Sequence, residues 1–204
     1  MNLPNKLTVA RLALTLLFVA LMSIAHPVTY FIAYIVFTIA AITDHYDGKY
    51  ARMYGLVTNF GKLLDPVADK VLMAAGFLVL MTIRDLRVPA WTITLIFARE
   101  YLVTGARSLA AAEGVVIAAN DQGKLKTIFQ MVYVFTFLFF ALAFQVFDTW
   151  PALAAHVPGS LALYKHYIGL ASLGSIIFVA AYTIYSGLIF ARENWSVLGL
   201  NRLS

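Results

Sequence analysis

Cysteine is absent from the 204-residue chain, and charged residues are scarce. Without cysteine there can be no disulfide, no thiolate nucleophile and no cysteine-bound zinc. Asp, Glu, Lys and Arg make up 12% of the residues, whereas soluble domains carry about 25%. The hydrophobic fraction of 62% and the mean hydropathy of +0.83 also exclude a disordered chain. So little polar side chain cannot cover a soluble globule, and the composition therefore indicates a polytopic membrane protein.

Six segments are candidates for membrane spans, because a spanning helix needs about 20 mostly apolar residues. They lie at residues 7–24, 29–43, 65–83, 89–112, 125–147 and 167–190. The second is short, but its helical pattern continues through Asp47 to about Arg52. No hydrophilic stretch is long enough for a separate domain. We therefore predict one all-α integral membrane domain, residues 1–204, with six transmembrane helices.

The distribution of Lys and Arg predicts the orientation of these helices. With the N-terminus inside, the inner side receives 12 of the 15 basic residues, and the outer side only Arg84, Arg87 and Lys165. By the positive-inside rule, both termini are expected in the cytoplasm. The basic residues are scattered among apolar runs, so the net charge of +5 does not indicate a nucleic-acid partner. One alternative stays open at the start, where Ser23-Ile24-Ala25 resembles a signal-peptide cleavage site.

Acidic residues gather near the predicted inner boundary. Four of the 10 lie between residues 44 and 69: Asp44, Asp47, Asp65 and Asp69. At 3.6 residues per turn, the first two share one helix face and the last two share a face of the next helix. A short turn around residues 54–58 would make the two helices antiparallel, so that all four carboxylates converge. Oxygen ligands of this kind favour Mg²⁺, Mn²⁺ or Ca²⁺ over zinc or copper.

These acids have two other interpretations. The acids could form solvated ion pairs with neighbouring lysine and arginine side chains, or they could line the pathway of a cation transporter. Neither interpretation needs Gly48, Ala51 and Gly61 at their fixed spacings. Small residues there allow a large ligand to approach the helix backbone, and Arg52 offers a fork for a phosphate.

The whole pattern resembles the signature of the CDP-alcohol phosphatidyltransferases. It reads Asp44-x2-Asp47-Gly48-x2-Ala51-Arg52-x8-Gly61-x3-Asp65-x3-Asp69, with all eight fixed positions present. The resemblance implies the family's six-helix membrane fold, usually a homodimer. It also implies the reaction, in which an alcohol attacks the phosphatidyl phosphorus of a CDP-linked lipid and CMP leaves.

The resemblance further implies the roles of the signature residues. Two divalent cations, Mg²⁺ or Mn²⁺, would be held by Asp44, Asp47, Asp65 and Asp69. Asp65 would bridge the cations, and Asp69 would also be the catalytic base. The expected CDP pocket comprises Gly48, Ala51, Arg52 and Gly61, with Thr58 as a diphosphate contact. Asn5 and Thr8 either touch the nucleotide or cap the first helix.

Other stretches resemble the bacterial phosphatidylglycerophosphate synthases within this family, namely the opening Pro4-Asn5-Lys6, the run from Gly61 to Lys70, and the segments around Arg99 and Gly123. Their acceptor is sn-glycerol 3-phosphate, a dianion. The acceptor-phosphate residues expected here are Lys62, Arg99, Arg107, Lys124 and Lys126, each of which could instead be an ion-pair partner or a membrane anchor.

The expected function is therefore a phosphatidyl transfer at the cytoplasmic side of the inner (cytoplasmic) membrane, from CDP-diacylglycerol to sn-glycerol 3-phosphate. Inositol phosphate, serine and a second phospholipid stay open as alternative acceptors. Small residues near the start of the last span indicate a close helix contact, either between subunits of the homodimer or within one chain. They are Gly169, Ala171, Ser172, Gly174 and Ser175.

Overall fold

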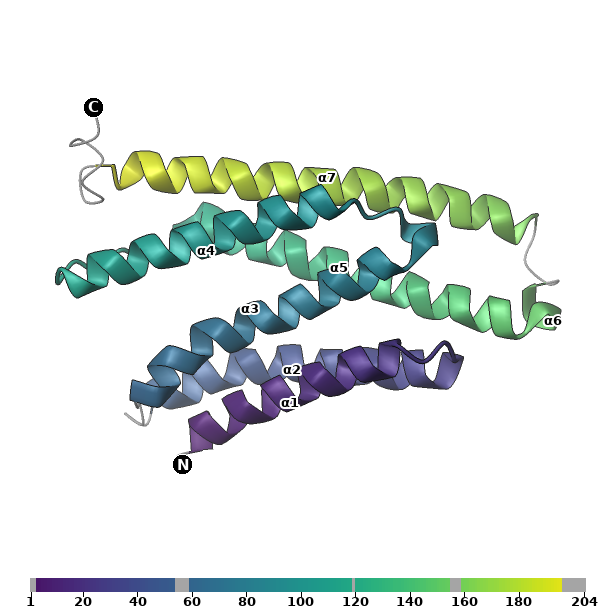
Figure 1. The fold of residues 1–204 in the computed structure, drawn as a ribbon, viewed down its shortest axis with the longest axis horizontal. Helices are drawn as coiled ribbons and strands as arrows, with labels where there is room; N and C mark the ends of the chain where they lie inside the picture. Colours follow the sequence, from purple (N-terminus) through teal and green to yellow (C-terminus); the bar gives the residue numbers. More distant parts are fainter. Residues whose placement is uncertain (1–2, 54–58, 119, 155–158, 196–204) are drawn as a thin grey trace.

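The computed structural model describes the backbone of residues 3–53, 59–118, 120–154 and 159–195. It describes side chains within 6–43, 67–118, 120–153 and 159–195. Regular structure in these ranges is entirely helical (Figure 1). Six long helices, α1 (Leu3–Met22), α2 (Pro27–Met53), α3 (Asn59–Thr82), α4 (Ala90–Ala112), α5 (Asp121–Thr149) and α7 (Leu161–Glu193), correspond to the six predicted segments.

Proline and asparagine mark several of the helix starts. Pro27 begins α2 and Pro89 occupies the N-cap of α4, positions at which the missing proline N–H costs no helical hydrogen bond. Asn120 caps α5, since its side-chain oxygen accepts from the Gly123 backbone N–H at 2.9 Å. Two short elements were not predicted: the 3₁₀ helix η1 (Arg84–Leu86) and α6 (Pro151–Ala154).

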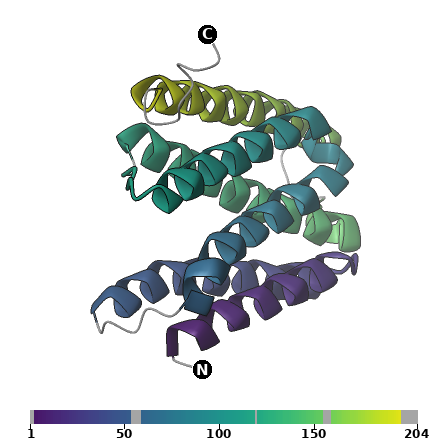
Figure 2. The same cartoon turned by 60° about the vertical axis from the view of Figure 1, so that its left-hand side comes forward.

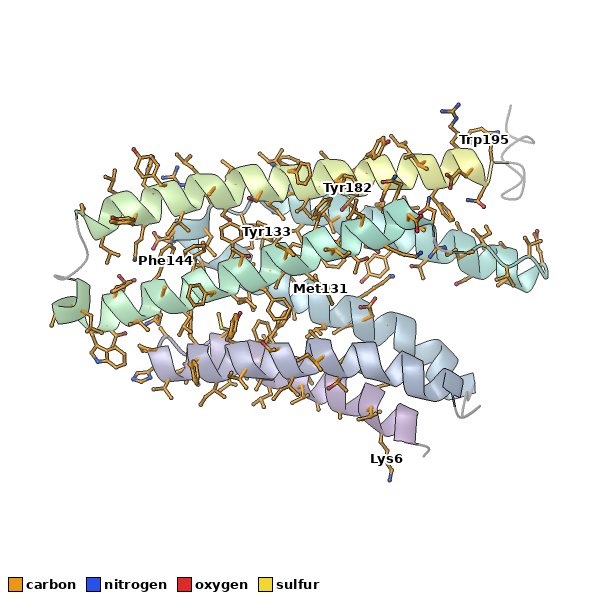
Figure 3. All side chains as sticks on the ribbon, turned by 180° about the vertical axis from the view of Figure 1, so that it is seen from behind. Lys6, Met131, Tyr133, Phe144, Tyr182 and Trp195 are labelled. Carbon is orange, nitrogen blue, oxygen red and sulfur yellow. The ribbon has the colours of Figure 1, made fainter. Side chains whose placement is uncertain are left out.

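The helices pack in layers. α1 and α2 form one side of the molecule and α7 the other, while α3 and α5 pass between them (Figures 1 and 2). Aromatic rings fill the junction: the ring of Phe37 on α2 lies 5.1 Å from that of Phe18 and 5.2 Å from that of Phe135. Tyr133 on α5 lies between α5 and α7 (Figure 3), where its hydroxyl is 2.8 Å from the Ser172 hydroxyl oxygen.

The outward surface is largely apolar. Leu16, Leu102, Leu109 and Leu188 are each more than 60% exposed, as expected of side chains that face lipid. Among the described residues, α5 and α7 are long and apolar enough to cross a membrane, with mean hydropathies of 2.0 and 1.8 in their most apolar windows. The segment Pro27–Thr43 of α2 is a shorter apolar helix. These features are those of a membrane protein.

One end of the molecule holds both described chain ends. Lys6 and Trp195 lie at this end in Figure 3, and α2 finishes and α3 begins there (Figure 1). Since α2 runs toward this end and α3 runs away from it, the two helices have the predicted opposite directions. The connection between them, which was predicted to be a short turn, lies outside the described residues.

The opposite end is fixed by polar contacts to the start of α7. Lys165 pairs with Asp148 at 2.7 Å and with Asp85 at 3.0 Å, and the Arg87 guanidinium donates to His166 Nδ1 at 3.0 Å. Gly169 lies against η1, where an added Cβ would come within 2.2 Å of the Asp85 carbonyl oxygen.

The small residues of α7 were predicted to make a close helix contact, either between subunits or within one chain. Gly169 and Ser172 serve packing within one chain, because they contact η1 and Tyr133 respectively. Gly174 and Ser175 are exposed, and an added Cβ at Gly174 would meet nothing within 4 Å.

Candidate active site

The helical backbone carries the acidic signature in the predicted register. Asp44 and Asp47 fall in the last turns of α2, and Asp65 and Asp69 fall in the first half of α3. Of the four carboxylates, only that of Asp69 is among the described side chains, and it is partly buried. The convergence of the four therefore stays a prediction. The other signature residues, Gly48, Ala51, Arg52 and Gly61, also lie outside the described side chains, as do Lys62 and Asn5. Thr58 lies outside the described residues altogether.

The donor chemistry fits hard divalent cations. Within the described side chains no group of three or more His, Asp or Glu residues could hold a metal ion. The fit therefore rests on the four carboxylates of the signature, at spacings of three and four residues on two continuous helices. A set made only of carboxylate oxygens suits Mg²⁺ or Mn²⁺.

Polar residues of α1 face the neighbouring helices. Thr8, Arg11 and Thr15 are each 2% exposed or less, and α1 packs against both α2 and α3. Arg11 is one of the 12 basic residues that the charge distribution assigns to the inner side, and the structure buries its side chain. The spacing 8, 11, 15 was the available signal, since it places three polar residues on one face of an apolar helix.

Side chains of α3, α4 and α5 form a buried ion cluster. We call it the Glu100 cluster, and its members are Lys70, Arg99, Glu100, Lys126 and Gln130. The Glu100 carboxylate accepts from Lys126 Nζ and from Gln130 Nε2, the latter at 3.4 Å. Arg99 Nη1 lies 3.5 Å from the same carboxylate, and Lys70 Nζ lies 4.0 Å from its second oxygen. One carboxylate thus gathers three cations from three helices.

The Glu100 cluster continues into α7. Arg99 Nη2 donates to Ser186 Oγ at 2.9 Å, and Gln130 Nε2 donates to Thr183 Oγ1 at 3.2 Å. Gly187 makes room for the Arg99 stem, because an added Cβ would lie 2.9 Å from Arg99 Cγ. Polar atoms on four helices are therefore linked inside an otherwise apolar bundle.

The electrostatic balance of the Glu100 cluster is positive. Its three cations, Lys70, Arg99 and Lys126, share one carboxylate, which leaves a formal charge of +2 among these groups. The side chains of Lys70, Glu100 and Lys126 are only 14%, 12% and 10% exposed. Removing charges from water is costly unless they are paired, so a bound dianion would offset the remaining charge.

The predicted acceptor-phosphate residues fall into different environments. Arg99 and Lys126 meet in the Glu100 cluster. Lys124 is 65% exposed and pairs with Asp121 at 2.8 Å, and Arg107 lies over the Phe190 ring at 5.2 Å.

Sequence reasoning did not select Lys70, Glu100, Gln130 or Ser186 as site residues. One signal was present for Gln130: it lies four residues after the predicted Lys126, so both fall on one face of α5.

Comparisons with known proteins show which family the chain belongs to. The family model described as CDP-alcohol phosphatidyltransferase matches residues 1–159. A Bacillus subtilis protein named CDP-diacylglycerol–glycerol-3-phosphate 3-phosphatidyltransferase is 37% identical over 97% of each chain. A Rickettsia bellii protein of the same name is 36% identical over 91% of this chain and 92% of its own. A rice cardiolipin synthase (CMP-forming) is 33% identical over 97% of this chain and 59% of its own length.

These matches, together with the helical fold and the complete signature, identify the class. The chain belongs to the CDP-alcohol phosphatidyltransferase family, a family of membrane enzymes that generally depend on divalent cations.

Proposed function

We propose that this protein transfers the phosphatidyl group of CDP-diacylglycerol to sn-glycerol 3-phosphate, releasing CMP and forming phosphatidylglycerol phosphate. The observation that carries the proposal is the likeness to the Bacillus subtilis relative over 97% of both chains. The eight-position signature and the buried surplus of positive charge in the Glu100 cluster support it independently.

In the proposed reaction, Asp69 accepts the proton of the acceptor hydroxyl, whose oxygen forms a bond to the phosphatidyl phosphorus. The bond from that phosphorus to CMP breaks, and CMP leaves with the electron pair. Asp44, Asp47, Asp65 and Asp69 would hold two Mg²⁺ or Mn²⁺ ions, with Asp65 between them. Bound there, the ions supply charge neutralisation of the diphosphate and of the leaving group.

The liponucleotide pocket is proposed to follow the signature. Gly48, Ala51 and Gly61 lack bulk and would let the cytidine diphosphate approach the helix backbones. Arg52 and Thr58 would donate to the diphosphate. Asn5 and the buried Thr8 on α1 would bound the same pocket, since α1 packs against α2 and α3.

The acceptor phosphate is proposed to bind at Arg99 and Lys126. Lys62, in the first turn of α3, is proposed as a further phosphate contact. A formal charge of +2 suits a phosphate monoester dianion better than a neutral alcohol such as serine. Lys124 and Arg107 stay predictions from sequence, because their described partners are Asp121 and Phe190.

The finer topology is also a proposal. Six helices would span the inner membrane, with both termini and the active site on the cytoplasmic side and two copies forming a homodimer. Support comes from the six long helices, from the position of both described chain ends at one end of the molecule and from the 12-to-3 distribution of basic residues (Figure 1).

The test is CMP release by the purified full-length protein from CDP-diacylglycerol with Mg²⁺ or Mn²⁺. The acceptor panel contains glycerol 3-phosphate, inositol phosphate, serine and phosphatidylglycerol. We expect release only with glycerol 3-phosphate, loss of release with EDTA, and a fall of at least about a hundredfold in Asp69→Asn, the usual contribution of a general base. Release with another alcohol would change the acceptor, and no release from folded protein would favour the cation transporter.

A further inference from the structure

We infer that Glu100 is a positioning residue, which holds Arg99 and Lys126 in the geometry that receives the acceptor phosphate. The inference rests on the proposed function, because it concerns how the acceptor site of that function is organised. Glu100 lies outside the aspartate signature and is not proposed to contact a substrate.

The contacts of Glu100 carry the first part of the argument. Its carboxylate accepts from Lys126 on α5, lies 3.5 Å from Arg99 Nη1 on α4 and lies 4.0 Å from Lys70 Nζ on α3. Without the carboxylate, three cations would face one another with little water to screen them, and like charges at this burial repel strongly. Glu100 therefore keeps Arg99 and Lys126 close enough to each other to bind one phosphate together.

The neighbours of the carboxylate fix its direction. Gln130 donates to Glu100 and to Thr183, so the amide ties the carboxylate to α7. Arg99 is held from two sides, by Glu100 at Nη1 and by Ser186 at Nη2. Its buried Nε finds no hydrogen-bond partner among the described residues. A guanidinium fixed in this way loses little further freedom when an anion binds, which favours affinity.

The position of the Glu100 cluster along the chain connects it to the reaction. Lys70 follows directly after Asp69, the proposed base, and its Nζ reaches back toward Glu100. Lys70, the member of the cluster on α3, thus directly follows the last residue of the signature. The Glu100 cluster is therefore next along the chain to the residue that the proposed reaction uses as its base.

Charge provides the second part of the argument. With Glu100 ionised, the cluster carries a formal +2, which matches a phosphate monoester dianion. Replacing Glu100 by Gln would leave +3 on the same three side chains, so that at least one of them would turn away or lose its proton. The prediction is therefore weaker binding of the acceptor, not stronger binding through extra charge.

The experiment measures steady-state kinetics of full-length Glu100→Gln with each substrate varied in turn. We expect the KM for glycerol 3-phosphate to rise at least about tenfold, as for the loss of a charged hydrogen bond. The KM for CDP-diacylglycerol should stay within about twofold. The matched control is Glu113→Gln, the exposed carboxylate at the C-cap of the same helix, which should leave both constants unchanged.

A conservative variant separates positioning from packing. Glu100→Asp keeps the charge on a shorter stem and should recover at least part of the lost acceptor affinity. An unchanged KM for glycerol 3-phosphate in folded Glu100→Gln, or a fall in kcat alone, would overturn the inference. A wild-type protein without glycerol 3-phosphate-dependent CMP release would instead overturn the proposed function.

A double variant covers the case in which Glu100→Gln fails to fold. Glu100→Gln combined with Lys126→Met removes both charges of the buried pair, and it is compared with Lys126→Met alone. Because Glu100 acts through the cations it holds, the second substitution should raise the acceptor KM by less than about threefold beyond the first. A full tenfold further rise would show that Glu100 acts independently of Lys126 and would overturn the inference that it positions this lysine.

Discussion

At the scale of single residues, burial distinguishes two lysines that the sequence presents as equals. Lys126 is about 10% exposed and pairs with Glu100, whereas Lys124, two positions earlier, is 65% exposed and pairs with Asp121. We expect Lys126→Met to raise the KM for glycerol 3-phosphate at least about tenfold, because a charged contact in a dry site contributes about 1.5–3 kcal/mol. Lys124→Met should change it less than about threefold, since ion pairs on the exposed surface contribute little.

The measurement is the same CMP-release assay, with folding of each variant checked by gel filtration in detergent. Equal effects of the two substitutions would mean that Lys124 also contacts the acceptor, and that burial does not separate the two lysines. A larger effect of Lys124 would contradict the placement of the acceptor phosphate at the Glu100 cluster.

Sequence was informative about some residues of this site and silent about others, for a physical reason. The four aspartates stand out because fixed spacings on helices encode which side chains share a face. Glu100 contacts Lys126, which is 26 residues away, and Arg99 contacts Ser186, which is 87 residues away. Such pairings depend on how helices pack, and no periodicity within one helix records them.

At the scale of elements, the approach of η1 to α7 requires a residue without a side chain. An added Cβ at Gly169 would lie 2.2 Å from the Asp85 carbonyl oxygen, and backbone cannot move aside as a side-chain end can. Overpacking of this kind costs about 1–3 kcal/mol. Since each kcal/mol shifts the melting temperature of a chain of this size by about 2–4 °C, we expect Gly169→Ala to melt about 2–12 °C lower.

The matched control lies one and a half turns further along the same helix. Gly174→Ala would place its Cβ in open space, and the melting temperature should change by less than about 2 °C. Thermal unfolding in detergent, followed by circular dichroism, measures both variants. A drop in Gly174→Ala as large as that in Gly169→Ala would mean that another surface, such as a second copy of the chain, covers Gly174.

Helix boundaries followed from the sequence where a chemical signal marked them. Pro27 and Pro89 stand at helix starts, and the continuation of α2 through Arg52 was predicted from its spacing and confirmed by α2 (Pro27–Met53). The 3₁₀ turn η1 was missed because its shape depends on contacts with α7. Arg87 ends that turn in the left-handed region, with φ of 53°. Because non-glycine residues seldom adopt this conformation, an arginine in the sequence does not predict it.

At the scale of the whole molecule, the two ends of the bundle have different tasks. One end holds both described chain ends, the last turns of α2 and the first turns of α3, which carry the signature (Figure 1). The other end carries η1 and the contacts of Lys165 with Asp85 and Asp148, which fasten the start of α7. A membrane substrate and a water-soluble acceptor can meet only where the polar site reaches one aqueous side. The proposed orientation makes that side the cytoplasm.

Cysteine labelling tests this orientation. Because the chain has no cysteine of its own, any label on the protein must be on the introduced residue. Glu113 at the end of α4 and Ser160 at the start of α7 are exposed and lie at opposite ends of the bundle. In spheroplasts, a membrane-impermeant maleimide should label Ser160→Cys and leave Glu113→Cys unlabelled until the membrane is permeabilised. The reverse pattern would place the signature on the outer side, where no cytoplasmic acceptor could reach Asp69. Labelling of both variants before permeabilisation would contradict the prediction that the two positions lie on opposite sides of the membrane.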